Sequence, residues 1–170
     1  MNTLEKANYL SLRVSANTIT KEDIVSFVEP LVKSEFRRDE LIKVVEAVPK
    51  LKVLRPLFIE FLKSLDIEVL DDEKEAKKRL VLYHLNKIAN EDLDVVKETH
   101  ELIEATNFDD NNWLGPLYGT WNSYCEIDSY IKYTPKKVTK EDLVNEHIGD
   151  MISSAKKLLH DYKDWNSSSL

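Results

Sequence analysis

The apolar residues of the C-terminal segment alternate in steps of four and three, and this spacing constrains the fold more than any other feature. The residues are Val144, Ile148, Met151, Ala155, Leu158, Tyr162 and Trp165. The alternation places these side chains along one stripe of an α-helix, as in a heptad seam. We therefore expect one long helix from about residue 140 to 165, roughly 39 Å in length at 1.5 Å per residue. Residues 166–170 should form a frayed tail.

Two segments share a helix-start pattern. Ile19-Thr-Lys-Glu-Asp-Ile24 and Val138-Thr-Lys-Glu-Asp-Leu143 each place a threonine three residues before an aspartate, between two apolar residues. This pattern is typical of a capping box with a hydrophobic staple. The residues that follow the two segments do not match, so we interpret the similarity as two helices capped in the same way rather than as an internal repeat.

Helical spacing of apolar residues recurs over 24–32, 38–48, 51–65 and about 91–106. Residues 9–14 lie in a short amphipathic segment but also alternate like a strand. Taken together, the patterns predict an all-α fold, an irregular bundle of about six or seven helices that ends in the long heptad-patterned helix. We expect residues 1–170 to form a single helical domain.

Composition restricts the class of protein. The chain has 170 residues, of which 42% are hydrophobic and 32% charged, as in a globular domain with a sizeable core. Cys125 is the one cysteine, and the first residues lack the pattern of a signal peptide, so we expect a cytoplasmic protein. No apolar run reaches the length of a membrane span. The net charge of −7 argues against a nucleic-acid partner.

Motifs for catalysis or metal binding are not readable in the sequence. None of the four histidines follows a glutamate by three residues, and there is no cysteine pair for zinc and no glycine-rich phosphate loop. We therefore expect no metal, no cofactor and no enzyme activity. His84 lies in an apolar segment and should be a hydrogen-bonded core residue. Glu126 and Asp128 should raise the pKa of the Cys125 thiol, which we expect to be buried against Trp121.

One short motif points to a different class of protein. Leu158-Leu-His-Asp161 resembles the His–Asp pair of metal-dependent HD phosphohydrolases, in which adjacent ligands hold a cation. The resemblance covers four residues. That family also requires an earlier histidine and a later aspartate, and nine residues follow Asp161 here. The resemblance implies an alternative, a small phosphohydrolase-like enzyme with a metal at His160 and Asp161. The other interpretation is a surface histidine and aspartate on the last helix.

The acidity of the chain is concentrated in residues 91–131. This segment contains ten acids and one lysine, a formal charge of −9, so the rest of the −7 chain carries +2. It also contains six of the fifteen aromatic residues and the stretch NNWLGPLYGTWNSY at 111–124. We interpret that stretch as a shaped loop, in which Gly115-Pro116 and Gly119 turn the backbone and hold aromatic side chains outward.

Tryptophan and tyrosine dominate binding hot spots, and an acidic field speeds the capture of a basic protein. We therefore predict a partner-binding surface made of Glu98, Glu101, Glu104, Asp109, Asp110, Trp113, Tyr118 and Trp121. Two alternatives stay open at this point: the tryptophans fill the core, and the acids form an ordinary solvated helix face.

These observations favour a cytosolic protein-binding inhibitor. The class that fits best is a bacterial immunity protein or antitoxin that neutralises a basic toxin, such as a nuclease. Besides the phosphohydrolase-like enzyme, two further alternatives remain. One is an adaptor or assembly protein that forms a homodimer through the seam of its last helix. The other is a nucleic-acid mimic that occupies a DNA-binding protein.

Overall fold

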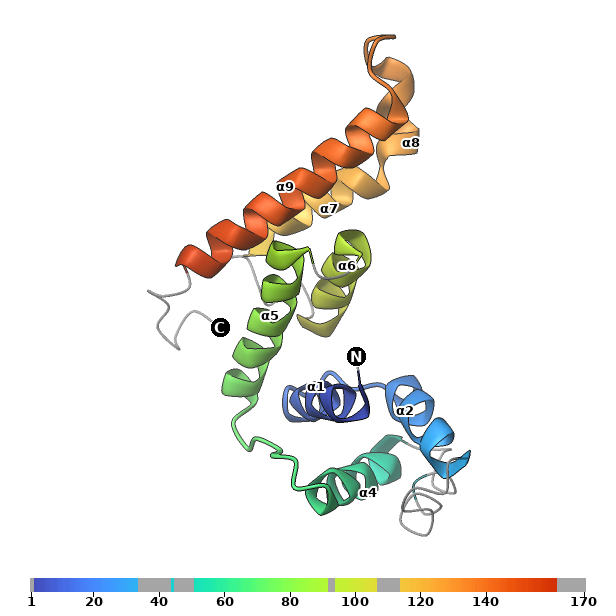
Figure 1. Cartoon of the computed structure of the whole chain (residues 1–170), viewed down its shortest axis with the longest axis vertical. Helices are drawn as coiled ribbons and strands as arrows, with labels where there is room; N and C mark the ends of the chain where they lie inside the picture. The colour runs from blue at the N-terminus through green and yellow to red at the C-terminus, as the bar shows by residue number, and fades with distance from the viewer. Residues whose placement is uncertain (1, 34–43, 45–50, 92–93, 107–113, 162–170) are drawn as a thin grey trace. The chain divides into compact units, whose positions relative to one another are not determined.

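The computed structural model describes residues 2–33, 44, 51–91, 94–106 and 114–161, and the regular structure in these ranges is helical, without a strand. The predicted all-α fold is confirmed (Figure 1). The helices are α1 (Thr3–Ser15), α2 (Lys21–Lys33), α4 (Leu51–Ser64), α5 (Glu73–Asn90), α6 (Val95–Thr106), α7 (Gly115–Cys125), α8 (Ile127–Tyr130), the short 3-10 helix η3 (Ile131–Tyr133) and α9 (Lys140–Asp161).

Contacts along the chain divide it into two compact units, Met1–Leu80 and Val81–Leu170. The expectation of a single domain over 1–170 therefore stays a prediction. Residues 9–14 belong to α1, so the helical interpretation of that segment is correct and the strand-like one is wrong. Apart from the buried Val44, the helix expected over 38–48 lies outside the described residues, as does the tail at 166–170.

Unit 1 is built around aromatic side chains of α2 and α4. Phe58 is fully buried, and its ring lies 6.0 Å from that of Phe27 in an edge-to-face arrangement and 6.3 Å from that of Phe61. Arg55 of α4 ties the end of α1 to this core by donating a hydrogen bond to the Val14 carbonyl oxygen at 2.7 Å. This partly buried hydrogen bond holds the C-terminal end of α1 next to α4.

The two predicted capping boxes are present. In each, the aspartate N–H donates to the threonine hydroxyl oxygen at 3.1 Å, and the threonine N–H donates to the aspartate carboxylate at 2.8 Å. The pairs are Thr20 with Asp23 before α2, and Thr139 with Asp142 before α9. The hydrogen bonds from Thr139 lower the pKa of the Asp142 carboxyl. Local sequence alone therefore specifies where these two helices begin.

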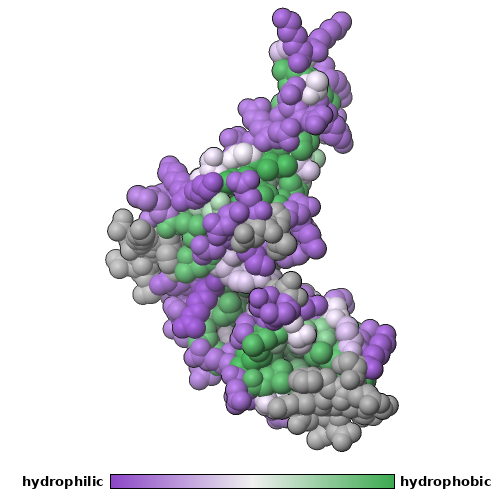
Figure 2. Space-filling model, in the orientation of Figure 1, coloured by the Kyte–Doolittle hydropathy of each residue, from purple (hydrophilic) through white to green (hydrophobic). Residues whose placement is uncertain are grey.

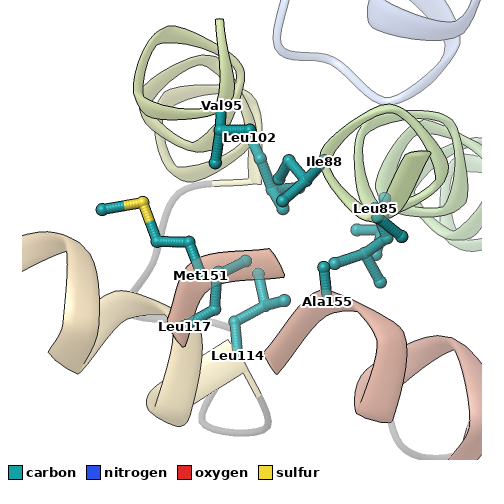
Figure 3. Close-up of a cluster of buried hydrophobic side chains, with 10 residues drawn as sticks. Leu85, Ile88, Val95, Leu102, Leu114, Leu117, Met151 and Ala155 are labelled. Carbon is teal, nitrogen blue, oxygen red and sulfur yellow. The ribbon is translucent and has the colours of Figure 1, made fainter. Parts of the chain in front are cut away.

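Helix α9 packs into the core of unit 2 through its heptad stripe. Met151 and Ala155 are fully buried, while Ile148 and Leu158 are partly buried against the same cluster. The buried cluster, shown in part in Figure 3, consists of Val81, Leu85, Ile88, Ala89, Val95, Leu102, Leu114, Leu117, Met151 and Ala155. Figure 2 shows apolar residues running along α9 and α7 between hydrophilic ones, as expected for a stripe at a helix–helix contact. The predicted helix is confirmed as far as Asp161, where the described segment ends.

The stretch from Gly115 to Tyr124 is helical, so the prediction of a sharply turned loop is wrong for these residues. Pro116 lies in the first turn of α7, where its missing N–H costs no hydrogen bond. A Cβ atom added to Gly119 would meet nothing within 4 Å. Among the described residues, positive φ angles occur instead at Asn17, Asp66 and Glu91, which follow α1, α4 and α5. Residues 111–113 lie outside the described ranges.

Among the described helices, we find none that combines the length and the apolar character needed to cross a bilayer.

Truncation of apolar side chains on the α9 stripe should destabilise the protein more where the side chain is more deeply buried. Met151→Ala removes a fully buried side chain from the unit 2 core and should lower the free energy of unfolding by about 2–5 kcal/mol. Leu158→Ala, on the same stripe but partly exposed, should cost less. Urea denaturation of the two variants measures the difference. Equal and small losses would mean that the stripe does not face a closed core.

Removal of two helix-interior glycines should stabilise the protein. Neither Gly119 in α7 nor Gly149 in α9 has a positive φ or a neighbour that a methyl group would touch. Alanine in place of either glycine should therefore raise the free energy of unfolding by about 0.5–1 kcal/mol, because the unfolded chain loses conformational freedom. Thermal denaturation of the single and double variants checks this. A lower melting temperature would show that the backbone at these positions is not regular helix.

Candidate functional site

Helices α5 and α6 of unit 2 hold a buried histidine–glutamate pair. The His84 side chain is fully buried, and its Nδ1 atom lies 2.8 Å from Oε1 of Glu98, which is only 5% exposed. The expectation that His84 is a hydrogen-bonded core residue is confirmed. Glu98 faces His84 instead of solvent, and this corrects its assignment to the partner-binding surface. A buried carboxylate requires a partner of this kind, because an unpaired charge in an apolar core is very costly.

A second glutamate converges on the same pair. Glu101 lies one helical turn after Glu98 on α6, and one ligand atom each from His84, Glu98 and Glu101 falls within 4.8 Å of the other two. We refer to these three residues as the α5–α6 cluster. The cluster does not follow the Glu-x-x-His pattern of a single helix, because His84 lies on α5 and the two glutamates lie on α6. Two features of the sequence point to the cluster: the Glu-x-x-Glu spacing of α6 and a histidine in the apolar part of α5. Only the fold brings these two segments together.

Two lysines lie near the carboxylates of this cluster. The Nζ atom of Lys97 is 3.9 Å from a Glu101 carboxylate oxygen. Lys87 lies over the Tyr83 ring, 4.5 Å from its centre. Burial lowers the pKa of Lys87, but its hydrogen bond to Tyr83 and the negative charges of Glu98 and Glu101 outweigh this, so that the pKa is raised. The negative charges of Glu98 and Glu101 therefore favour the protonated form of Lys87.

An aromatic surface is formed where α6 meets α7. The ring of Trp121 stacks on that of His100, with centroids 5.4 Å apart and planes inclined by 15°, and Tyr118 lies beside Trp121 at 6.1 Å. Nε2 of His100 is 3.3 Å from a carboxylate oxygen of the exposed Glu104. We call His100, Glu104, Tyr118 and Trp121 the α6–α7 face. Trp121 is also packed against the unit 2 core, and it is partly buried rather than fully enclosed.

The structure therefore brings together part of the predicted partner-binding set. Tyr118, Trp121 and Glu104 lie on the α6–α7 face, with Glu101 one turn before Glu104 on the same helix. Asp109, Asp110 and Trp113 lie outside the described residues.

The other chemical candidates of the sequence occupy exposed positions. His160 and Asp161 are 84% and 53% exposed, with Nδ1 and Oδ1 3.4 Å apart, and no third metal-ligating residue joins them within the described ranges. Cys125 is exposed, so the expected burial against Trp121 is wrong. The expected direction of its pKa is confirmed: partial burial of the thiol and the charge of Glu126 raise it. This favours the unreactive thiol form at neutral pH.

Comparison with known proteins gives no relative: no family model matches the chain, and neither a curated protein nor a solved structure shows significant similarity to it.

Loss of the buried pair should cost far more than loss of an exposed pair on the same helix. In metal-free buffer, Glu98→Gln should lower the free energy of unfolding by about 1.5–3 kcal/mol, the value of a hydrogen bond to a charged group. Glu104→Gln is the matched control, because its pairing with His100 is solvent-exposed, and it should cost less than about 1 kcal/mol. Urea denaturation compares the two. Similar losses for both variants would contradict a buried, charge-bearing pair.

Proposed function

We propose that this protein binds a basic protein through the α6–α7 face and acts as a stoichiometric inhibitor, in the manner of a bacterial immunity protein or antitoxin. The observation that supports this most directly is Trp121, which is partly exposed, stacked on His100 and flanked by Tyr118 and the exposed Glu104. Tryptophan and tyrosine are the residues most enriched in binding hot spots.

The stacking of Trp121 favours its use as an anchor. The Trp121 ring stacks on His100 and packs against the unit 2 core. Because these contacts already restrict the side chain, partner binding costs little additional conformational entropy. A helix also holds these aromatic residues more rigidly than the loop that we expected from the sequence. Partner binding through this face therefore requires no reorganisation of the α7 backbone.

Charge selects the class of partner. Residues 91–131 carry −9, and exposed acids of this segment include Glu91, Asp94, Glu104 and Glu126. A field of this sign accelerates association with a positively charged surface and slows association with an acidic one. The active cleft of a nuclease is positively charged because its substrate is a polyanion. A basic toxin domain of the nuclease type is thus the partner that we propose, with the complex formed in the cytoplasm.

The alternatives receive less support. In the described part of the seam, Met151 and Ala155 are already buried within unit 2, which leaves less apolar surface for a homodimer. The phosphohydrolase-like alternative relies on His160 and Asp161, which are exposed and lack a third ligand in the described ranges. A nucleic-acid mimic would use the same acidic face and differs from the proposal in its partner.

The test uses the cognate partner identified by cross-linking and by the identity of the neighbouring gene, and we expect that partner to be basic. Trp121→Ala should raise the dissociation rate about thirtyfold, equivalent to about 2 kcal/mol of binding free energy. Reversal of Glu104, Asp109 and Asp110 to lysine should mainly slow association, by an amount that shrinks at high salt. Surface plasmon resonance at two salt concentrations separates the two rates.

Tyr133→Ala provides the matched control, because Tyr133 is the most exposed aromatic residue in the described ranges and lies on η3, outside the α6–α7 face. It should leave both rates unchanged. An acidic cognate partner, or normal binding by Trp121→Ala, would contradict the proposal.

A further inference from the structure

We propose that the α5–α6 cluster is a binding site for a divalent cation of the zinc type, with His84, Glu98 and Glu101 as its ligands. The cation would link α5 to α6 within unit 2. This inference is independent of the proposed partner, because it uses a buried cluster and not the α6–α7 face.

The three ligand atoms are close to the geometry that such an ion requires. They lie within 4.8 Å of one another, and the Nδ1–Oε1 distance between His84 and Glu98 is 2.8 Å. Ligand atoms bound at about 2.0–2.1 Å around a tetrahedral zinc ion are about 3.4 Å apart. Binding of one ion to both groups therefore requires the His84–Glu98 distance to open by about 0.6 Å, from a hydrogen bond to a pair of metal ligands. Glu101 can also move toward the ion, because its side chain is 39% exposed and its contact with Lys97 is 3.9 Å long.

The donor set selects the class of cation. One imidazole nitrogen suits zinc and other first-row transition metals, whereas magnesium and calcium prefer oxygen ligands throughout. A neutral imidazole and two carboxylates supply two negative charges, which balance a divalent ion in a buried position. Three protein ligands leave a further position for water, as in many zinc sites. Binding displaces the proton shared between His84 and Glu98, because both groups must present a lone pair to the metal.

A hydrogen-bonded pair alone does not account for the second carboxylate. Glu98 already pairs with Nδ1 of His84, yet Glu101 brings another negative charge to the same atoms. Two carboxylates at this separation repel each other unless a cation lies between them. Lys97 is 3.9 Å from Glu101, beyond hydrogen-bond distance, and Lys87 lies over the Tyr83 ring. The positive charge of Lys87 also acts on Glu98 and Glu101. A metal ion bound directly to both carboxylates is the more compact counter-charge.

The test is a titration of the chelator-treated full-length protein with zinc chloride, followed by calorimetry and native mass spectrometry. We expect one zinc ion per chain and a melting temperature that rises with zinc, since the ion binds the folded state. Glu101→Gln should weaken zinc binding about tenfold or more and reduce the rise in melting temperature at a given zinc concentration. Because Glu101 is partly exposed, this variant should fold normally, which circular dichroism in metal-free buffer verifies.

Glu104→Gln is the matched control, one turn further along α6 and outside the cluster. It should bind zinc as the unaltered protein does. Magnesium chloride in large excess should not compete. The proposal is overturned if no saturable binding occurs, if Glu101→Gln binds zinc with unchanged affinity, or if Glu104→Gln removes the binding. The last result would assign the ion to His100 and Glu104 at the surface.

Discussion

The packing of α9 against α7 is the contact on which unit 2 depends. Met151 and Ala155 are buried against a cluster that also contains Leu114 and Leu117 at the start of α7, and Leu85 and Ile88 of α5 (Figure 3). Because one stripe of α9 fills this core, the position of α7 is set by a helix that begins fifteen residues after α7 ends. The aromatic side chains of α7 then reach the surface beside α6. The α6–α7 face and the α5–α6 cluster both lie on helices that this shared core holds together.

Burial of polar groups is the second constraint on unit 2. His84 and Glu98 are both buried, and a buried pair of this kind is tolerated only when its members satisfy each other. Replacement of the pair by apolar residues of similar volume is often neutral or stabilising in proteins. The pair is therefore not explained by stability alone. A metal ligand set that includes Glu101 gives a reason for a cluster of charged side chains between α5 and α6.

Glycine and proline show how local signals mislead. Both are strong turn formers, and their concentration at 115–119 suggested a shaped loop. In the structure, Pro116 occupies the first turn of α7 and Gly119 continues the helix, while the left-handed positions at the ends of α1 and α4 are filled by Asn17 and Asp66. Asparagine and aspartate adopt this conformation more readily than other non-glycine residues. Packing of α7 against α9 outweighs the weak helix propensity of two glycines, which amounts to about 1 kcal/mol each.

The sequence by itself determined the helical class, the capped starts of α2 and α9, the inward stripe of α9 and the core position of His84. Each of these follows from residues within one or two helical turns, where hydrogen bonds and side-chain spacing are local. Only the tertiary structure decided that Glu98 is buried, that Glu101 joins it beside His84, and that Trp121 stacks on His100. These contacts connect α5 with α6 and α6 with α7. The meeting of two helix faces depends on how the helices pack in three dimensions, which no spacing within a single helix records.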